Sequence, residues 1–173
     1  MKDYISLHNH TTYSLMDSLI KPLKLFEKVK ELGQSAVAVC DHATLSAAWD
    51  SLKASEQTGI KLIMGCEFNF VDDLAKGGKI RHIILLAKNH EGYKNLLKLN
   101  KLANDHNIIF FNKATPRIDW DLLKQYSAGL ICTTACSGGI LGQLINTRRI
   151  DEAKVQAKRL KEIFGDSLAF EIQ

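Results

Sequence analysis

Short apolar runs alternate with longer amphipathic runs along most of the chain. The apolar runs predict strands over residues 4–8, 35–41, 61–70, 82–87, 129–135 and 168–172. In the intervening segments apolar residues recur at spacings of three and four, which predicts helices over 23–33, 47–59, 91–105, 119–126, 138–147 and 151–164. Gly33 and Gly59 stand where the first two helices should end. This alternation is typical of an α/β fold.

Several of the predicted strands are apolar on both faces, as in "AVAV" at 36–39 and "IILL" at 83–86. Such strands are buried on both sides, which favours a parallel sheet or barrel covered by helices over an open antiparallel sheet. One connection differs, because "VDDLAKGGK" at 71–79 is typical of a hairpin loop. A turn near residue 75 would fold His82 back opposite Glu67. We therefore expect a β/α barrel that contains one hairpin.

Composition and length indicate how many domains the chain forms and in which compartment it lies. The 173 residues, 46% hydrophobic and 24% charged, suffice for one domain with its own core. Asp3 and His8 interrupt the stretch that a signal peptide would need, and no apolar run approaches the roughly 20 residues of a membrane span. We expect a cytoplasmic protein without a membrane segment. Its four cysteines form no Cys-x-x-Cys pair and are expected to be reduced thiols.

Net charge does not identify a partner. The formal charge of +4 permits contact with phosphate-bearing molecules but does not require it. Lys154, Lys158 and Lys161 would form one basic stripe on the last predicted helix. Both a solvated helix face and a phosphate contact fit that stripe.

Polar side chains cluster at the ends of the predicted strands, where barrel enzymes place their chemistry. The first strand runs into His8 and His10, the second runs into Asp41 and His42, Glu67 lies in the third, His82 opens the fourth and Cys136 follows the fifth. All are ligand types for zinc, manganese or iron. Each also has a simpler explanation taken singly: a helix cap for His42, a turn residue for Asp17 or a small buried thiol for Cys136. Because burying several such groups together is costly without a cation, the set predicts a metal centre.

Five segments carry a resemblance to a known family: "HNHTTYSLMD", "VAVCDH", "GCEFNF", "HIILLAKNHEGYKNLLKL" and "GLICTTACSGG". They resemble the amino-terminal polymerase-and-histidinol-phosphatase (PHP) domain of bacterial-type DNA polymerase III alpha subunits. The His-x-His and Asp-His pieces would fit any member of that superfamily, whereas "LLAKNHEGYKNLLKL" resembles the replicative polymerases in particular. The resemblance implies a distorted, TIM-like, seven-stranded β/α barrel with up to three divalent metal ions at its rim.

The resemblance also implies which residues hold these ions. His8 and His10 would hold one metal, Glu67 would bridge it to a second, and His82 with Cys136 would complete the second shell. Asp17 and His42 would belong to a third, with Asp41 behind the ligands. Zinc or manganese is expected, with magnesium or iron as further options.

The sequence departs from the family pattern in two places. The family's Asp-x-His pair on a later strand does not appear before the chain ends at "LAFEIQ", and Ala135 stands where the polymerases usually have glycine. We therefore expect residues 1–173 to form a single PHP domain that lacks its carboxyl-terminal part. The barrel would be incomplete, and the isolated fragment weakly active or inactive.

Three functions fit the resemblance. The first is metal-dependent phosphodiester hydrolysis, as a 3′–5′ exonuclease of a DNA polymerase III alpha subunit, with DNA, the other polymerase domains and a separate proofreading exonuclease subunit as partners. The second is a non-catalytic scaffold for the polymerase or its proofreading partner. The third is a phosphomonoesterase of the histidinol phosphatase type. The sequence retains every family ligand that falls within its 173 residues, which favours the hydrolytic function.

Overall fold

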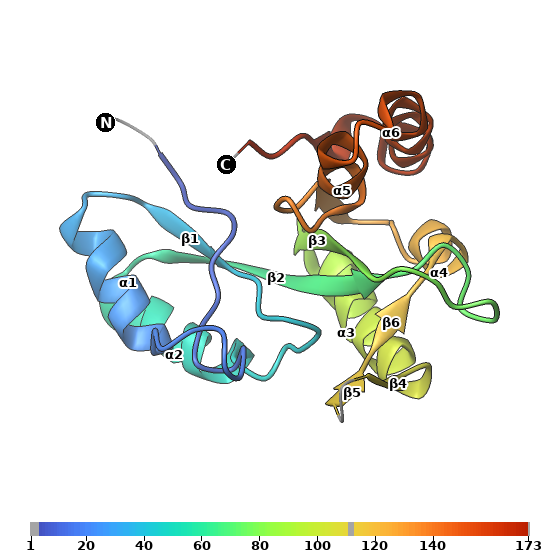
Figure 1. Ribbon diagram of the computed structural model, residues 1–173. Helices are drawn as coiled ribbons and strands as arrows, with labels where there is room; N and C mark the ends of the chain where they lie inside the picture. The colour runs from blue at the N-terminus through green and yellow to red at the C-terminus, as the bar shows by residue number, and fades with distance from the viewer. Residues whose placement is uncertain (1–3, 111–112, 173) are drawn as a thin grey trace.

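The computed structural model describes residues 4–110 and 113–172 and combines helices with a mixed β-sheet (Figure 1). The helices are α1 (Pro22–Glu31), α2 (Ala48–Thr58), α3 (His90–Asp105), α4 (Trp120–Gln125), α5 (Ile140–Asn146) and α6 (Ile150–Phe164), followed by a 3-10 turn at Gly165–Ser167. The strands are β1 (Ala36–Val39), β2 (Lys61–Phe70), β3 (Arg81–Ala87), β4 (Ile108–Phe110), β5 (Lys113–Thr115), β6 (Arg117–Ile118), β7 (Leu130–Thr133) and β8 (Leu168–Ala169). None of the helices described is long and apolar enough to cross a membrane.

The main sheet has the strand order β1-β2-β3-β7-β8, and β6 pairs with the far half of β2. β1 and β6 run parallel to β2, and β8 runs parallel to β7, whereas β3 runs antiparallel to both of its neighbours. The predicted α/β class is confirmed. Among the described residues the sheet does not close into a barrel, in keeping with the incomplete barrel expected from the sequence. It is mixed rather than parallel, because a hairpin instead of a helical crossover joins β2 to β3.

The β2–β3 hairpin matches its prediction closely. Gly77 and Gly78 adopt positive φ values of 70° and 131°, which glycine tolerates at a turn. The register places Glu67 opposite Ile84, and Asn69 opposite His82. Directly paired residues share a face, as do alternate residues along a strand. Glu67 and His82 therefore lie diagonally on one face of the sheet, two register positions away from the expected direct opposition.

The first predicted strand, over 4–8, is reduced to a single bridge between Ser6 and Val37. The chain instead follows β1 in an irregular path, in which Ala38 N donates to Ser6 O and Cys40 N donates to Asn9 O, both at 2.9 Å. The short strands β4, β5 and β6 were not expected. The periods of two and of 3.6 residues cannot be distinguished in two or three residues.

Apolar residues pack on both faces of the sheet. A large cluster that includes Phe68, Leu85 and Leu96 lies between the sheet and helices α3 and α6. A small cluster on the other face is made by Ala38, Cys40, Ile84, Leu86 and Ala135. Since Ile84 shares its face with Glu67, the polar residues described next lie beside this small cluster rather than in the main core.

Candidate metal centre

The irregular segment beside β1 places His8 and His10 over the sheet. Asn9 between them points the other way, and its side-chain amide donates to Ser6 O at 3.1 Å and to Ala38 O at 3.0 Å. This anchor sets both imidazoles on one side of the chain. Their Nε2 atoms are 3.1 Å apart.

Glu67 stands at the centre of the polar cluster, in the middle of β2, with only 1% of its side chain exposed. Its Oε2 lies 2.7 Å from His8 Nε2 and 3.1 Å from His10 Nε2. Its Oε1 lies 2.5 Å from His82 Nδ1 and 3.7 Å from His42 Nδ1. Each carboxylate oxygen thus faces its own pair of histidines.

His42 and Asp17 extend the cluster toward solvent. The loop after β1 brings His42 beside β2, where its backbone bridges to Glu67, and its Nε2 lies 3.4 Å from Asp17 Oδ2. The ring of His42 stacks on that of His10 with centroids 4.2 Å apart. Burial lowers the pKa of His42, which favours the neutral form that binds metals.

The cluster contains three overlapping groups whose potential ligand atoms lie within 4.8 Å of one another. They are His8, His10 and Glu67; His10, Asp17 and His42; and His42, Glu67 and His82. Six of the seven predicted ligands take part in these groups. Glu67 is common to two of them.

Cys136, the seventh predicted ligand, follows β7 and lies beside His82. An added Cβ on Gly138 would come 3.3 Å from His82 Nδ1 and 3.5 Å from Cys136 Sγ, so both atoms border the same small space. Gly138 N donates to Cys136 Sγ at 3.3 Å. In the structure His42, rather than Cys136, completes the compact group around Glu67 and His82.

Asp41, predicted to lie behind the ligands, is buried and accepts three hydrogen bonds. Thr11 N donates to its Oδ1 at 2.6 Å, Thr11 Oγ1 to its Oδ2 at 2.7 Å, and Ser14 Oγ to its Oδ1 at 2.7 Å. Ser14 Oγ in turn lies 3.2 Å from His10 Nδ1. Asp41 therefore reaches His10 through the serine hydroxyl.

The donor set fits a divalent cation. Glu67 Oε1 and His82 Nδ1 are buried and make no hydrogen bond, although they face each other at 2.5 Å. Buried polar atoms without a partner are rare and call for an explanation. Both atoms are accounted for if they would serve as ligands of one cation, since a carboxylate oxygen and an imidazole nitrogen are common ligand atoms. A Cβ at position 138 would fill part of that space.

Glu171, which the sequence did not single out, also contacts the cluster. Its Oε1 lies 2.6 Å from His8 Nδ1, and its Oε2 accepts a hydrogen bond from Thr133 Oγ1 at 2.7 Å. The only signal in the sequence was its place at the end of the last predicted strand. A single glutamate in a strand carries no pattern of its own.

The electrostatics follow from these contacts. Burial disfavours the ionised form of Glu67, but the close imidazoles of His10, His8 and His82 outweigh it and hold the pKa of Glu67 well below its usual value. Burial also acts to lower the pKa of His8, but hydrogen bonds to Glu171 and Glu67 raise it to about 10. Both pKa shifts arise from contacts between protein side chains. A cation at His8 Nε2 would have to compete with a proton, so its affinity should fall as the pH is lowered.

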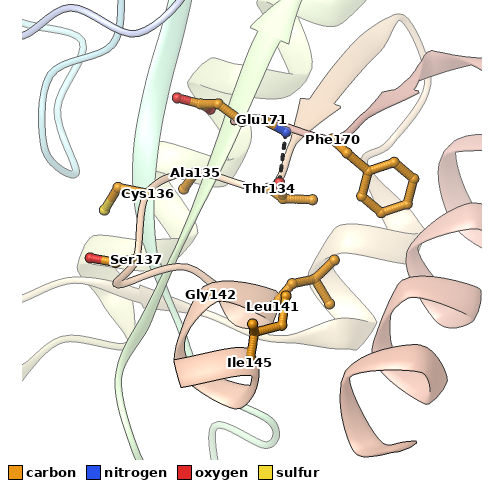
Figure 2. Close-up of a pocket in the computed structure, with 9 residues that line it drawn as sticks. All are labelled: Thr134, Ala135, Cys136, Ser137, Leu141, Gly142, Ile145, Phe170 and Glu171. Atoms are coloured by element: carbon orange, nitrogen blue, oxygen red, sulfur yellow. Dashed lines mark hydrogen bonds between the residues drawn. The ribbon is translucent and has the colours of Figure 1, made fainter. Parts of the chain in front are cut away.

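The cavity in Figure 2, of about 500 Å³, lies next to the cluster, and Cys136 and Glu171 are among the residues that line it. Its lining includes Leu141, Ile145 and Phe170. The side chains of Cys136 and Glu171 point to one side, whereas Phe170 points to the other (Figure 2).

The basic stripe predicted on the last helix is largely matched by acidic neighbours. Lys154 Nζ lies 3.1 Å from Asp151 Oδ1, and Lys161 Nζ lies 3.1 Å from Asp166 Oδ1. These exposed pairs favour a solvated helix face over a phosphate contact.

Comparisons with known proteins bear on the family. The chain is 39% identical to the DNA polymerase III subunit alpha of Borreliella burgdorferi over 98% of this chain and 15% of that protein. It is 38% identical to that of Aquifex aeolicus over 99% of this chain and 16% of that protein. The chain thus spans about a sixth of the length of these relatives.

Two solved structures show weaker likeness. One is a protein from Bifidobacterium adolescentis assigned as a metal-dependent phosphoesterase, with a TM-score of 0.48 and 24% identity over 61% of this chain and 34% of that chain. The other is an amidohydrolase from Chromobacterium violaceum, with a TM-score of 0.45 and 20% identity over 58% of this chain and 33% of that chain. The match to a family model is far more extensive. The model of the PHP domain matches residues 6–173, and the chain therefore belongs to the PHP domain family.

Proposed function

We propose that residues 1–173 are the amino-terminal PHP domain of a DNA polymerase III alpha subunit and that the cluster around Glu67 holds divalent cations for phosphodiester hydrolysis. The long relatives support the first part, because this chain matches about the same fraction of each. The reaction proposed is 3′–5′ exonuclease cleavage of DNA. Zinc or manganese is the cation that an imidazole-rich donor set favours.

The observation that carries this proposal is the shared carboxylate. Glu67 takes part in two of the three compact groups, and its two oxygens face different histidines. A carboxylate in that position suits a site in which two cations lie close together. An isolated structural metal would not need a second set of histidines across the same carboxylate.

The residues divide into three sets of ligands. His8 and His10 would hold one cation, His82 with Cys136 would hold a second beside Glu67, and Asp17 with His42 would contribute to a third. Bound divalent cations supply Lewis acidity and lower the pKa of water for in-line attack on a phosphodiester. The protein would then need no serine or cysteine nucleophile of its own.

The test uses the full-length polypeptide that carries this sequence. We expect metal analysis by mass spectrometry to find zinc or manganese in the wild type, and Glu67→Gln to lose most of it. Degradation of a 3′-labelled primer should depend on the metal, and His10→Ala should reduce its rate by several orders of magnitude, since loss of the ion removes the attacking water. Glu56→Gln, an exposed change of the same kind on α2, is the matched control.

Four results would contradict the proposal. A wild-type protein that takes up no metal, or a Glu67→Gln variant that keeps it, would remove the metal centre. Metal binding without any cleavage of DNA would instead favour the scaffold for the polymerase or its proofreading partner. Release of phosphate from a small monoester in place of nucleotides from DNA would favour the histidinol phosphatase type.

A further inference from the structure

We infer that Glu171 is a positioning residue, which fixes the ring of His8 so that its Nε2 is presented to the metal centre. The inference rests on the proposed function, since it concerns how one ligand of that centre is held. It adds a residue from the segment after β8 to a site otherwise built from the segment before α1, the segments after β1 and β7, and the β2–β3 hairpin.

The hydrogen bonds assign the donor and acceptor roles. Thr133 Oγ1 donates to Glu171 Oε2 at 2.7 Å, and Glu171 Oε1 lies 2.6 Å from His8 Nδ1. An ionised carboxylate can only accept, so the proton of this second contact belongs to His8 Nδ1. Nε2 lies 2.7 Å from Glu67 Oε2 and 3.1 Å from His10 Nε2, so without a cation it carries a proton too. A cation would replace that proton and take the lone pair of Nε2, while Nδ1 keeps its own proton toward Glu171.

Glu171 is itself held by the sheet. β8 pairs with β7 through Cys132 opposite Leu168, and Thr133 opposite Ala169. Just beyond this pairing, the backbone N–H of Glu171 donates to Thr134 Oγ1 at 2.9 Å, the bond drawn in Figure 2. The carboxylate therefore approaches His8 from a fixed direction.

The chain holds the other histidine of this pair by a weaker device. His10 Nδ1 faces the neutral hydroxyl of Ser14 at 3.2 Å, whereas His8 Nδ1 faces a carboxylate at 2.6 Å. Hydrogen bonds to an ionised acceptor are shorter and about twice as strong as neutral ones. A carboxylate behind a metal-binding imidazole also raises the basicity of the ligand atom, and losing such a partner typically costs about 10–100-fold in metal affinity.

The test compares Glu171→Ala and Glu171→Gln in the full-length polypeptide. Both changes keep the backbone bond to Thr134, so they leave the attachment of the chain at β8 in place. The zinc affinity is measured by competition with a chromophoric chelator, and the environment of the ion is read from the absorption bands of the cobalt-loaded protein. Phe170→Ala, whose side chain points away from the cluster, is the control (Figure 2).

We expect Glu171→Ala to weaken zinc binding about 10–100-fold and to alter the cobalt bands. Glu171→Gln should fall between Ala and the wild type, because its amide oxygen can still accept from Nδ1 but carries no charge. Phe170→Ala should bind zinc as the wild type does. Wild-type zinc affinity and cobalt bands in Glu171→Ala would overturn the inference alone. Failure of the wild type to bind zinc would overturn the proposed function, and the inference with it.

Discussion

A single hydroxyl shows how the metal centre is built at the scale of a residue. Ser14 Oγ has one proton, which it donates to Asp41 Oδ1 at 2.7 Å. It must therefore accept from His42 N at 3.1 Å and from His10 Nδ1 at 3.2 Å. One side chain, only 2% exposed, thus orients the imidazole of one histidine and the backbone of another.

Replacing this serine tests its double role. We expect Ser14→Ala to lower the free energy of unfolding by about 1–3 kcal/mol, since it leaves buried hydrogen-bonding groups without partners. It should also weaken zinc binding, by less than Glu171→Ala. Urea denaturation and zinc titration measure the two effects. Ser46→Ala, at an exposed position, should change the free energy of unfolding by less than about 0.5 kcal/mol, and equal behaviour of the two variants would refute this role.

At the scale of elements, helix α3 and strand β7 meet through two glycines. A Cβ on Gly92 would lie 1.9 Å from Gly129 O, and Gly129 itself has a φ of 70°. Asn89, the N-cap of α3, accepts from Gly92 N at 2.9 Å in the same place. The backbones approach this closely because neither position carries a side chain. The start of β7, and with it the segment that leads to Cys136, is set by this contact.

Gly92→Ala should therefore destabilise the protein although it lies in a helix. In an exposed helix such a change gains up to about 1 kcal/mol. Here the new methyl group would collide with backbone, and we expect a loss of about 1–3 kcal/mol in the free energy of unfolding. Thermal or urea denaturation measures it. Lys94→Ala, at an exposed position of the same helix, is the control and should leave the free energy of unfolding nearly unchanged. A Gly92→Ala variant more stable than the wild type would show that the contact is looser than the structure indicates.

The elements also show what the sequence could and could not predict. β2 and β3 were predicted nearly to the residue, because long apolar runs flank a turn with two glycines. The segment 4–8 has the same composition as a strand, yet it pairs only at Ser6, since backbone pairing depends on neighbours that local composition does not reveal.

The same limit applies to the metal centre. Its histidines were recognisable because they occur in pairs with other ligand types at strand ends. Glu171 was not, because its role arises from a contact with His8 across 163 positions of sequence. Nor could periodicity assign His42 to the group around Glu67, because a bridge between the loop after β1 and the middle of β2 creates that neighbourhood.

At the scale of the whole molecule, the four cysteines mark the difference between core and metal centre. Cys66 and Cys132 lie in the large cluster on one face of the sheet, and Cys40 lies in the small cluster on the other. All three are buried, and burial raises the pKa of each thiol. Cys136 alone among the four is partly exposed. A thiol reagent should therefore distinguish the interior from the rim.

We expect brief alkylation of the native protein at mildly alkaline pH to modify Cys136 first. The thiolate is the reactive form, and a raised pKa together with burial suppresses it at Cys40, Cys66 and Cys132 until the protein unfolds. Peptide mass spectrometry gives the extent of alkylation at each site. Zinc should slow the reaction at Cys136, because a thiolate bound to the cation no longer attacks the reagent, and Glu67→Gln should remove most of that protection. If zinc still protects Cys136 in Glu67→Gln, the thiol binds zinc independently of the cluster. Rapid alkylation of Cys40, Cys66 or Cys132 in the native protein would show that the sheet opens more readily than its packing predicts.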